Sequence, residues 1–457
     1  MKTPKETIDT LLKNSEIMLD GARAAGVQSD IFAQHFIEST VVYEGNDFSV
    51  SKSNTTSIYG IRAIVDGKLG FMTTNSSDSS VLRDVAAETR QLASLSVPSD
   101  HHQIAEKIKN TGYYENFDPE LQAISPADLY HYLQLVVDEV FKVKNIALDR
   151  AEISCVQQFW TLSNSHGLSQ RASATNCSWY AMGMGKTATE VTSFDYDGGC
   201  VWDKASLERK IIETMERFRQ SLSGSLSPRP AKAYNGAVLL HPVAVIDILG
   251  QAIGFNANGK NHLDGISSWK NLMGEQVTSR WLSVRENPLD KSRPEGWNPF
   301  DREGISTANH EIIKDGRLNF VAHNCFSAHQ SGTKPTGNAA GDANSLPQIG
   351  FSNLIIENAK EQEISDWALC QQLGTGLVLK RFSGNADPIS GQFSGVAKNS
   401  WWLENGERNH AVDETMVSGN VFEALKHIQT IGAALHTTIG GTQAPYILID
   451  GISVTGG

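Results

Sequence analysis

The stretch that decides the fold is residues 237–249, which read AVLLHPVAVIDIL. An apolar run leads into a histidine and a proline, and apolar residues then recur with a helical period. The stretch therefore predicts a short buried strand that runs into a helix opening at His241. A hydrolytic zinc helix would need a carboxylate beside that histidine and a second imidazole about one turn later. Pro242 and Ile246 stand at these two positions, so the stretch predicts a metal-site scaffold without its ligands.

The composition is that of an ordinary globular protein. Hydrophobic residues make up 40% and charged residues 20% of the 457 residues, and the net charge is −12. We expect no nucleic-acid partner, because phosphate binding needs clustered Lys and Arg. We expect no membrane partner, because no apolar run reaches the length of a span. The five cysteines are widely spaced and form no CxxC pair, which favours reduced thiols and a cytoplasmic location.

The first half of the chain mixes helical and strand patterns. Asp66-Gly67 predicts a tight hairpin turn, and Asp78 and Ser125 are predicted helix caps. Residues 98–122 are predicted to be a mobile connection, and the polar, proline-bounded residues 221–230 a linker. The predicted helices span 5–25, 78–95, 125–144 and 203–222, and the predicted strand regions span 29–39, 40–50, 57–71 and 150–200.

Beyond the linker, short strands separated by glycines predominate. We predict an α+β protein with a mixed α/β N-terminal domain (1–224) and a β-rich C-terminal domain (225–457), an antiparallel sheet or open barrel. Helices are predicted at 242–254, 261–272 and 420–432, and strands at 281–285, 307–314, 318–322, 354–357, 377–382 and 446–454.

Other histidines are further candidates for metal ligands. His310-Glu311 begins like the HExxH motif, but Lys314 replaces the second histidine, and the segment is better interpreted as a strand entering a hairpin. His323 and His329 flank Cys325 in the densest ligand-type cluster, although this spacing matches no zinc pattern. An independent metallohydrolase using His241 with His323 or His329 therefore stays open as an alternative hypothesis.

Several motifs taken together resemble the TldD/PmbA family, once called modulators of DNA gyrase. The likeness covers nearly the whole chain. It rests on the order and spacing of five motifs: Gly60-Ile61-Arg62 with Asp66–Phe71, Pro299–Gly304, Pro335–Ala339, Ser390–Ala397 and Ser418–Asn420.

The resemblance implies a particular role for this chain. TldD-type chains of the family carry HExxxH on the helix after the strand, together with a C-terminal cysteine as a further zinc ligand. Here only His241 matches, Pro242 and Ile246 replace the other positions, and no cysteine follows Cys370. The chain is thus similar to the TldE/PmbA type, with no catalytic or metal-ligating residue of its own.

The family implies further expectations about partners and substrate. These are a cytoplasmic heterodimer with a TldD-type subunit that holds the zinc, and cleavage of unfolded peptides. We take Phe393, Ser394 and Gly395 as candidate peptide contacts, because the sheet edges of a β-rich domain can add an extended peptide as a strand. The alternative is a non-proteolytic peptide-binding or regulatory homodimer.

Overall fold

The computed structural model describes residues 3–24, 26–106, 112–360 and 363–456. The N-terminal half is one long curved sheet, with the strand order β3-β2-β1-β5-β6-β4 and β7 paired to β6. Its strands are β1 (Gln28–Glu44), β2 (Asp47–Val65), β3 (Lys68–Thr74), β4 (Tyr113–Asn116), β5 (Ile146–Asn164), β6 (Ser169–Gly185) and β7 (Asp195–Val201). Its helices are α1 (Pro4–Ala22), α2 (Ser79–Ser94), α3 (Pro119–Gln122), α4 (Pro126–Val140) and α5 (Lys204–Gly224).

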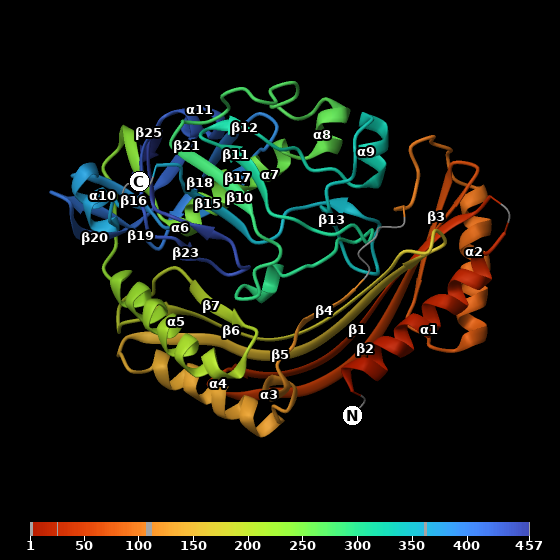
Figure 1. The fold of residues 1–457 in the computed structure, drawn as a ribbon. Coiled ribbons are helices and arrows are strands. Elements are labelled where there is room, and N and C mark those ends of the chain that lie inside the picture. The colour runs from red at the N-terminus through yellow and green to blue at the C-terminus, as the bar shows by residue number, and fades with distance from the viewer. Residues whose placement is uncertain (1–2, 25, 107–111, 361–362, 457) are drawn as a thin grey trace.

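The two faces of this sheet bury different partners, as the two-residue period of a strand requires. On β1, Ile31 and Ala33 pack under α1 and α2, while Val41 and Tyr43 pack under α4 and α5. The alternate residue Phe32 points to the other face, where it packs against the C-terminal half. Figure 1 shows the sheet curving around that half, with the helices on the outer side.

Local signals in this half are confirmed. The hairpin turns at Asp66-Gly67, which have φ angles of 49° and 73°. Asp78 caps α2 by accepting from the backbone amides of Ser80 and Val81, and Ser125 forms a capping box with Asp128 at the start of α4. Each of these features depends on residues close together in sequence, which explains why the sequence predicts them.

Three expectations about this half are wrong. Residues 29–39 and 40–50 are not two strands: β1 runs without a break to Glu44, and the turn falls at Gly45-Asn46, where both φ angles are positive. The segment 98–122 is not simply a connection, because β4 pairs with β6 and α3 follows; residues 107–111 lie outside the described residues. The predicted linker begins too early, since α5 extends to Gly224.

The cysteine expectation is also corrected. Cys155 of β5 lies directly opposite Cys177 of β6, with 4.1 Å between their Cα atoms, and the two form a disulfide. Strand register brings them together, which a separation of 22 residues does not reveal. Cys200, Cys325 and Cys370 are free thiols. The cytoplasmic location stays a prediction.

The helices and strands of the C-terminal half are mostly strands. Together with the helix-covered sheet of the N-terminal half, this confirms the α+β class. Within the described residues, a ten-stranded sheet has the path β17-β18-β21-β25-β9-β16-β19-β20-β8, with β22 on β25, and a six-stranded sheet has the path β12-β11-β10-β15-β24-β23. The strands of the larger sheet are β8 (Arg229–Pro230), β9 (Tyr234–Leu240), β16 (Gly376–Leu379), β17 (Arg381–Ala386), β18 (Gln392–Lys398), β19 (Ser400–Glu404), β20 (Glu407–Asp413), β21 (Met416–Asn420), β22 (Ile428–Ile431) and β25 (Ile447–Thr455). Those of the smaller sheet are β10 (Leu282–Glu286), β11 (His310–Lys314), β12 (Arg317–Leu318), β15 (Leu354–Asn358), β23 (His436–Thr437) and β24 (Gln443–Ala444); β13 (Ala339–Ala340) pairs with β14 (Gln348–Ile349).

Short helices connect these strands. They are α6 (Pro242–Ala244), the π-helix Val245–Gly250, α7 (Gln251–Asn256), α8 (Gly259–Asp264), a 3₁₀ turn (Pro294–Gly296), α9 (Cys325–Ser331), α10 (Asp366–Leu373) and α11 (Val421–Lys426). Two predicted helices are too long. The helix at 261–272 ends at Asp264, because Gly265 adopts a left-handed φ of 74°, and the helix at 420–432 stops at Lys426, because β22 pairs with β25. None of the described helices combines the length and apolar character that crossing a membrane requires.

Buried charges join the two halves. The guanidinium of Arg62 on β2 binds Asp30 on β1 and, through Nη1, the Oε1 of Glu303 at 2.8 Å. Glu303 also accepts from the backbone amide of Cys325 at 2.6 Å. All these side chains are almost fully buried. Two of the motifs that carried the resemblance, Gly60–Arg62 and Pro299–Gly304, are therefore in direct contact. The division at 224/225 stays a prediction.

Candidate functional site

His241 is placed by the central strand of the larger sheet. β9 pairs with β25 on one side and with β16, in parallel, on the other. Because β9 and β16 run side by side in the same direction, His241 and Lys380 follow them at the same edge, and the His241 amide donates to the Leu379 carbonyl at 2.9 Å. Arg381 comes next in the chain and joins the same site.

The imidazole of His241 caps the helix that it opens. Its Nδ1 accepts a hydrogen bond from the backbone amide of Val243 at 3.2 Å. A neutral imidazole that accepts at Nδ1 carries its proton on Nε2, so Nε2 is a donor here. Burial lowers the pKa of His241 well below its ordinary value, and the nearby charge of Lys380 lowers it further.

This arrangement does not fit a zinc ion. A zinc ligand needs a free lone pair, whereas the cap occupies that of Nδ1 and a proton occupies Nε2. Pro242 and Ile246 line the same cavity and offer no ligand atom, and Lys380 and Arg381 bring positive charge. In the part of the chain that the structure describes, no three His, Cys, Asp or Glu side chains are grouped as a metal site would require.

In an α-helix, Asp247 would point away from the face that carries Ile246. Both Ile246 and Asp247 line the cavity, because Val245–Gly250 forms a π-helix whose wider turn changes the direction of successive side chains. Burial raises the pKa of Asp247, although the charge of Arg381 and the nearby backbone amide of Phe382 favour its ionised form.

The cavity around His241 has a volume of about 380 Å³ and is lined by both halves of the chain. Asp195 on β7 is fully buried and binds Lys380 at 2.6 Å and Arg381 at 2.8 Å. The hydroxyl of Ser221 on α5 also donates to Asp195, at 2.5 Å. Desolvation alone would raise the pKa of Asp195, but its two cationic partners lower it overall. One carboxylate thus fixes both cations just beyond the C-terminal end of β16.

The remaining walls of this cavity are aromatic and cationic. The ring of His241 packs edge-on against Tyr446, with 4.9 Å between centroids, and lies near Trp401. The guanidinium of Arg408 stacks on Trp401 at 4.7 Å and donates to the Gly224 carbonyl at 2.5 Å. Hydrogen-bond donors of this kind suit an anionic group better than a cation.

A second cavity of about 620 Å³ continues from the first, and Tyr196, Asp247 and Arg381 line both. Strand β17 forms one wall of this second cavity. β17 is the last strand on the path of the larger sheet and pairs with β18 alone among the described strands. We call the second cavity the β17 groove.

The predicted peptide contacts lie one strand behind this groove. Phe393, Ser394 and Gly395 are on β18, opposite Ala386, Asn385 and Gly384 of β17. Phe393 is buried in the core, while Ser394 is exposed.

Sequence reasoning missed Asp195, Lys380 and Arg381. The Lys-Arg pair directly after the apolar run of β16 is visible in the sequence, but only the parallel pairing of β16 with β9 shows that the pair lies beside His241.

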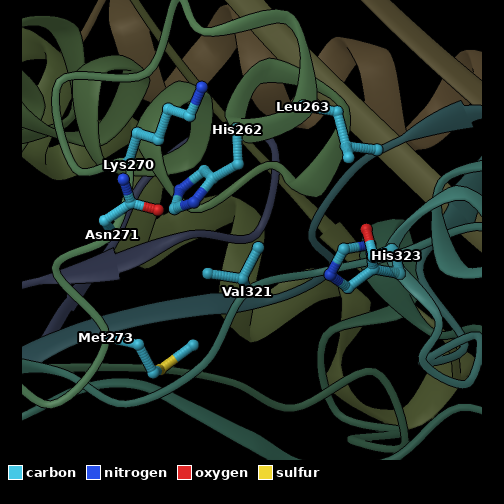
Figure 2. A pocket seen from close by; sticks show the side chains of 8 residues that line it. His262, Leu263, Lys270, Asn271, Met273, Val321 and His323 are labelled. Carbon is cyan, nitrogen blue, oxygen red and sulfur yellow. The ribbon is translucent and has the colours of Figure 1, made fainter.

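The other histidines occupy different surroundings. His323 lines a separate cavity of about 390 Å³ with His262 and Lys270, and Figure 2 shows these side chains. His329 packs against the ring of His101. The structure therefore does not bring His241 and His323 into one cavity, as the metallohydrolase hypothesis requires.

The remaining candidates have structural contacts. His310, in β11, stacks on the ring of Phe320, and β11 enters a turn at Asp315-Gly316, so the strand prediction for this HExxH-like segment is confirmed. Cys325 is buried and its pKa is raised by burial.

Comparisons with known proteins agree with this fold. Residues 233–456 match the family model described as PmbA/TldA metallopeptidase C-terminal domain, and residues 29–93 match PmbA/TldA metallopeptidase domain 1. Metalloprotease PmbA of Escherichia coli O157:H7 is 28% identical over 297 residues, which cover 64% of this chain and 61% of that protein. A Metalloprotease PmbA homolog of Haemophilus influenzae is 25% identical over 87% of this chain and 85% of its own length.

A solved structure shows the same fold. TldE from Thermococcus kodakarensis superposes with a TM-score of 0.83 at 20% identity, covering 99% of this chain and 100% of that one. The matched domains and relatives together place the protein: the chain belongs to the TldD/PmbA family.

Proposed function

We propose that this chain is the TldE/PmbA-type subunit of a zinc metallopeptidase, and that it holds an unfolded peptide beside the zinc site of a TldD-type partner. One observation carries the proposal. The cavity at the degenerate motif, where His241 is followed by Pro242 and Ile246, opens into a groove walled by a free sheet edge. The chain then contributes substrate binding, and the partner contributes the metal.

The edge of β17 is built to receive an extended peptide. The backbone amide of Asp387, directly after β17, donates to the Gln392 carbonyl at 2.9 Å and so points toward β18, whereas the amide of Phe382 faces the Asp247 carboxylate on the other side. Backbone amides alternate in direction along a strand, which directs the amides of Gly384 and Ala386 into the groove as well. A peptide added here is recognised through its main chain, so many sequences are accepted provided that the substrate is unfolded.

The supporting experiment is a reconstituted peptidase assay. This chain, a TldD-type partner and the mixture of both are incubated with a folded protein and with its denatured, alkylated form. We expect cleavage of the denatured form alone, and only when both chains are present. Equal cleavage of the two forms, or cleavage by this chain alone, would contradict the proposal. Peptide binding with no effect on the partner's cleavage would support the regulatory homodimer instead.

A pair of variants tests the edge itself. Ala386→Pro removes a backbone donor that faces the groove, and Ala386→Ser keeps that donor while also changing the side chain. We expect the proline variant to lower kcat/KM of the reconstituted enzyme by about tenfold, the effect of losing one to two hydrogen bonds, with the serine variant close to wild type. Equal activity of the two variants would exclude strand addition at β17.

A further inference from the structure

Resting on the proposed function, the His241 cavity and the β17 groove together give a direction to the bound peptide. The groove amides end at Phe382, whose N–H faces the carboxylate of Asp247. A peptide paired with β17 must therefore leave the strand there, and the next space is the His241 cavity, which shares Asp247 and Arg381 with the groove. One end of the peptide enters a cavity rich in hydrogen-bond donors.

The charges in this cavity select which end that is. Of its two lining carboxylates, Asp197 accepts from Arg217, and Asp247 faces the backbone amide of Phe382. Asp195, behind the wall, is bound by both Lys380 and Arg381.

Two arginines of this cavity keep free hydrogen-bond donors in the described part of the chain. Within the described residues, Arg408 has no carboxylate partner and bonds only the Gly224 carbonyl. Arg381 donates from Nε to Asp195 and from Nη2 to the Tyr196 carbonyl, and its Nη1 donates to no protein group among the described residues. The Nε2–H of His241 adds a neutral donor beside the ring of Tyr446. An ammonium would meet like charge here, and a carboxylate would meet donors on several sides.

We propose that this cavity binds the free C-terminal carboxylate of the peptide substrate, so that the peptide runs antiparallel to β17. In that direction the peptide passes Ala386 first and Arg381 last, and its C-terminus reaches Arg381, Arg408 and His241. A parallel peptide would instead place its N-terminal ammonium among these cations. The chain thereby fixes both the polarity of the substrate and the position of its end.

The test compares two fluorescein-labelled decapeptides of one unstructured sequence, with either a C-terminal carboxylate or a C-terminal carboxamide. Fluorescence anisotropy measures their Kd for this chain at low and at moderate salt. We expect the free acid to bind at least about tenfold more tightly than the amide, the factor that a charge-assisted hydrogen bond provides. The difference should shrink as salt screens the charges.

Two arginine variants complete the design. Arg408→Gln removes the cation that has no carboxylate partner, so it leaves no buried carboxylate unpaired. Arg317→Gln is the matched control, because among the described residues Arg317 also bonds only a backbone carbonyl, that of Gly274. We expect Arg408→Gln to abolish most of the acid-over-amide preference and Arg317→Gln to keep it, with both variants melting close to wild type.

The outcomes separate this inference from the function on which it rests. Equal affinity for acid and amide, or an undiminished preference in Arg408→Gln, would overturn carboxylate binding while leaving strand addition intact. If neither peptide binds, the proposed peptide-holding function fails and the inference fails with it.

Discussion

Arg62→Met is the perturbation that should damage the junction of the two halves most. The side chains of Arg62, Asp30 and Glu303 are 7%, 0% and 2% exposed. Methionine fills a similar volume but leaves two buried carboxylates without their cation. Removing one partner of a buried ion pair costs about 3–5 kcal/mol, because the remaining charge stays desolvated. We expect a loss of that size in the free energy of unfolding.

The assay is urea unfolding followed by tryptophan fluorescence, since Trp160 and Trp297 are in contact at the same junction, 5.7 Å between centroids. The control is Arg217→Met. The Arg217 side chain, which binds Asp197, is much more exposed than Arg62, so its loss should lower the free energy of unfolding by no more than about 1 kcal/mol. Losses of equal size in the two variants would refute the reasoning.

The pH dependence of the Arg62→Met deficit provides a second check. A buried carboxylate without a counter-charge takes up a proton more readily when folded than when unfolded. The native variant then binds more protons than its unfolded form as the pH falls, so its deficit relative to wild type should shrink between pH 8 and pH 5. A deficit that grows on acidification would contradict the buried-charge explanation.

Three further predictions concern single positions. Gly60→Ala should destabilise the chain by several kcal/mol in thermal or urea unfolding, because its Cβ would lie 2.0 Å from a backbone carbonyl oxygen of the C-terminal half, whereas Gly254→Ala in α7 has room and should be neutral or stabilising. Burial lowers the pKa of His241, so below pH 6.5 the unfolded wild-type chain takes up a proton that the folded chain does not. His241→Gln should therefore reduce the loss of stability on acidification by at most about 1.4 kcal/mol per pH unit. Equal acid sensitivity of the two chains in melts at several pH values would contradict a neutral imidazole. Thiol labelling of the denatured, unreduced chain should modify three cysteines, because Cys155 and Cys177 are bonded, and five labels would disprove the bond.

The features that the sequence predicts are local. The Asp66-Gly67 turn and the caps at Asp78 and Ser125 are determined by a few adjacent residues, and the alternating apolar pattern identifies strands. Features that depend on strand register cannot be predicted from a local sequence pattern. The Cys155–Cys177 bond follows from β5 lying against β6, a pairing that the spacing of the two cysteines does not specify.

The functional site shows the same division. His241, Pro242 and Ile246 are adjacent in sequence, so the loss of a metal-binding pattern is visible there. Lys380 reaches the site through the parallel pairing of β9 with β16, and Asp195 reaches it from the other half of the chain. Their sequence separation from His241 is too large for any local pattern to indicate the contact.

Zinc binding to the purified chain tests the central claim most directly. The wild-type chain and His241→Ala are incubated with a small molar excess of zinc, passed through gel filtration, and analysed for metal by mass spectrometry. We predict that the two chains retain the same, substoichiometric amount of zinc, because the Nδ1 of His241 caps a helix and its sequence neighbours offer no ligand. One zinc per wild-type chain, lost in His241→Ala, would contradict the account.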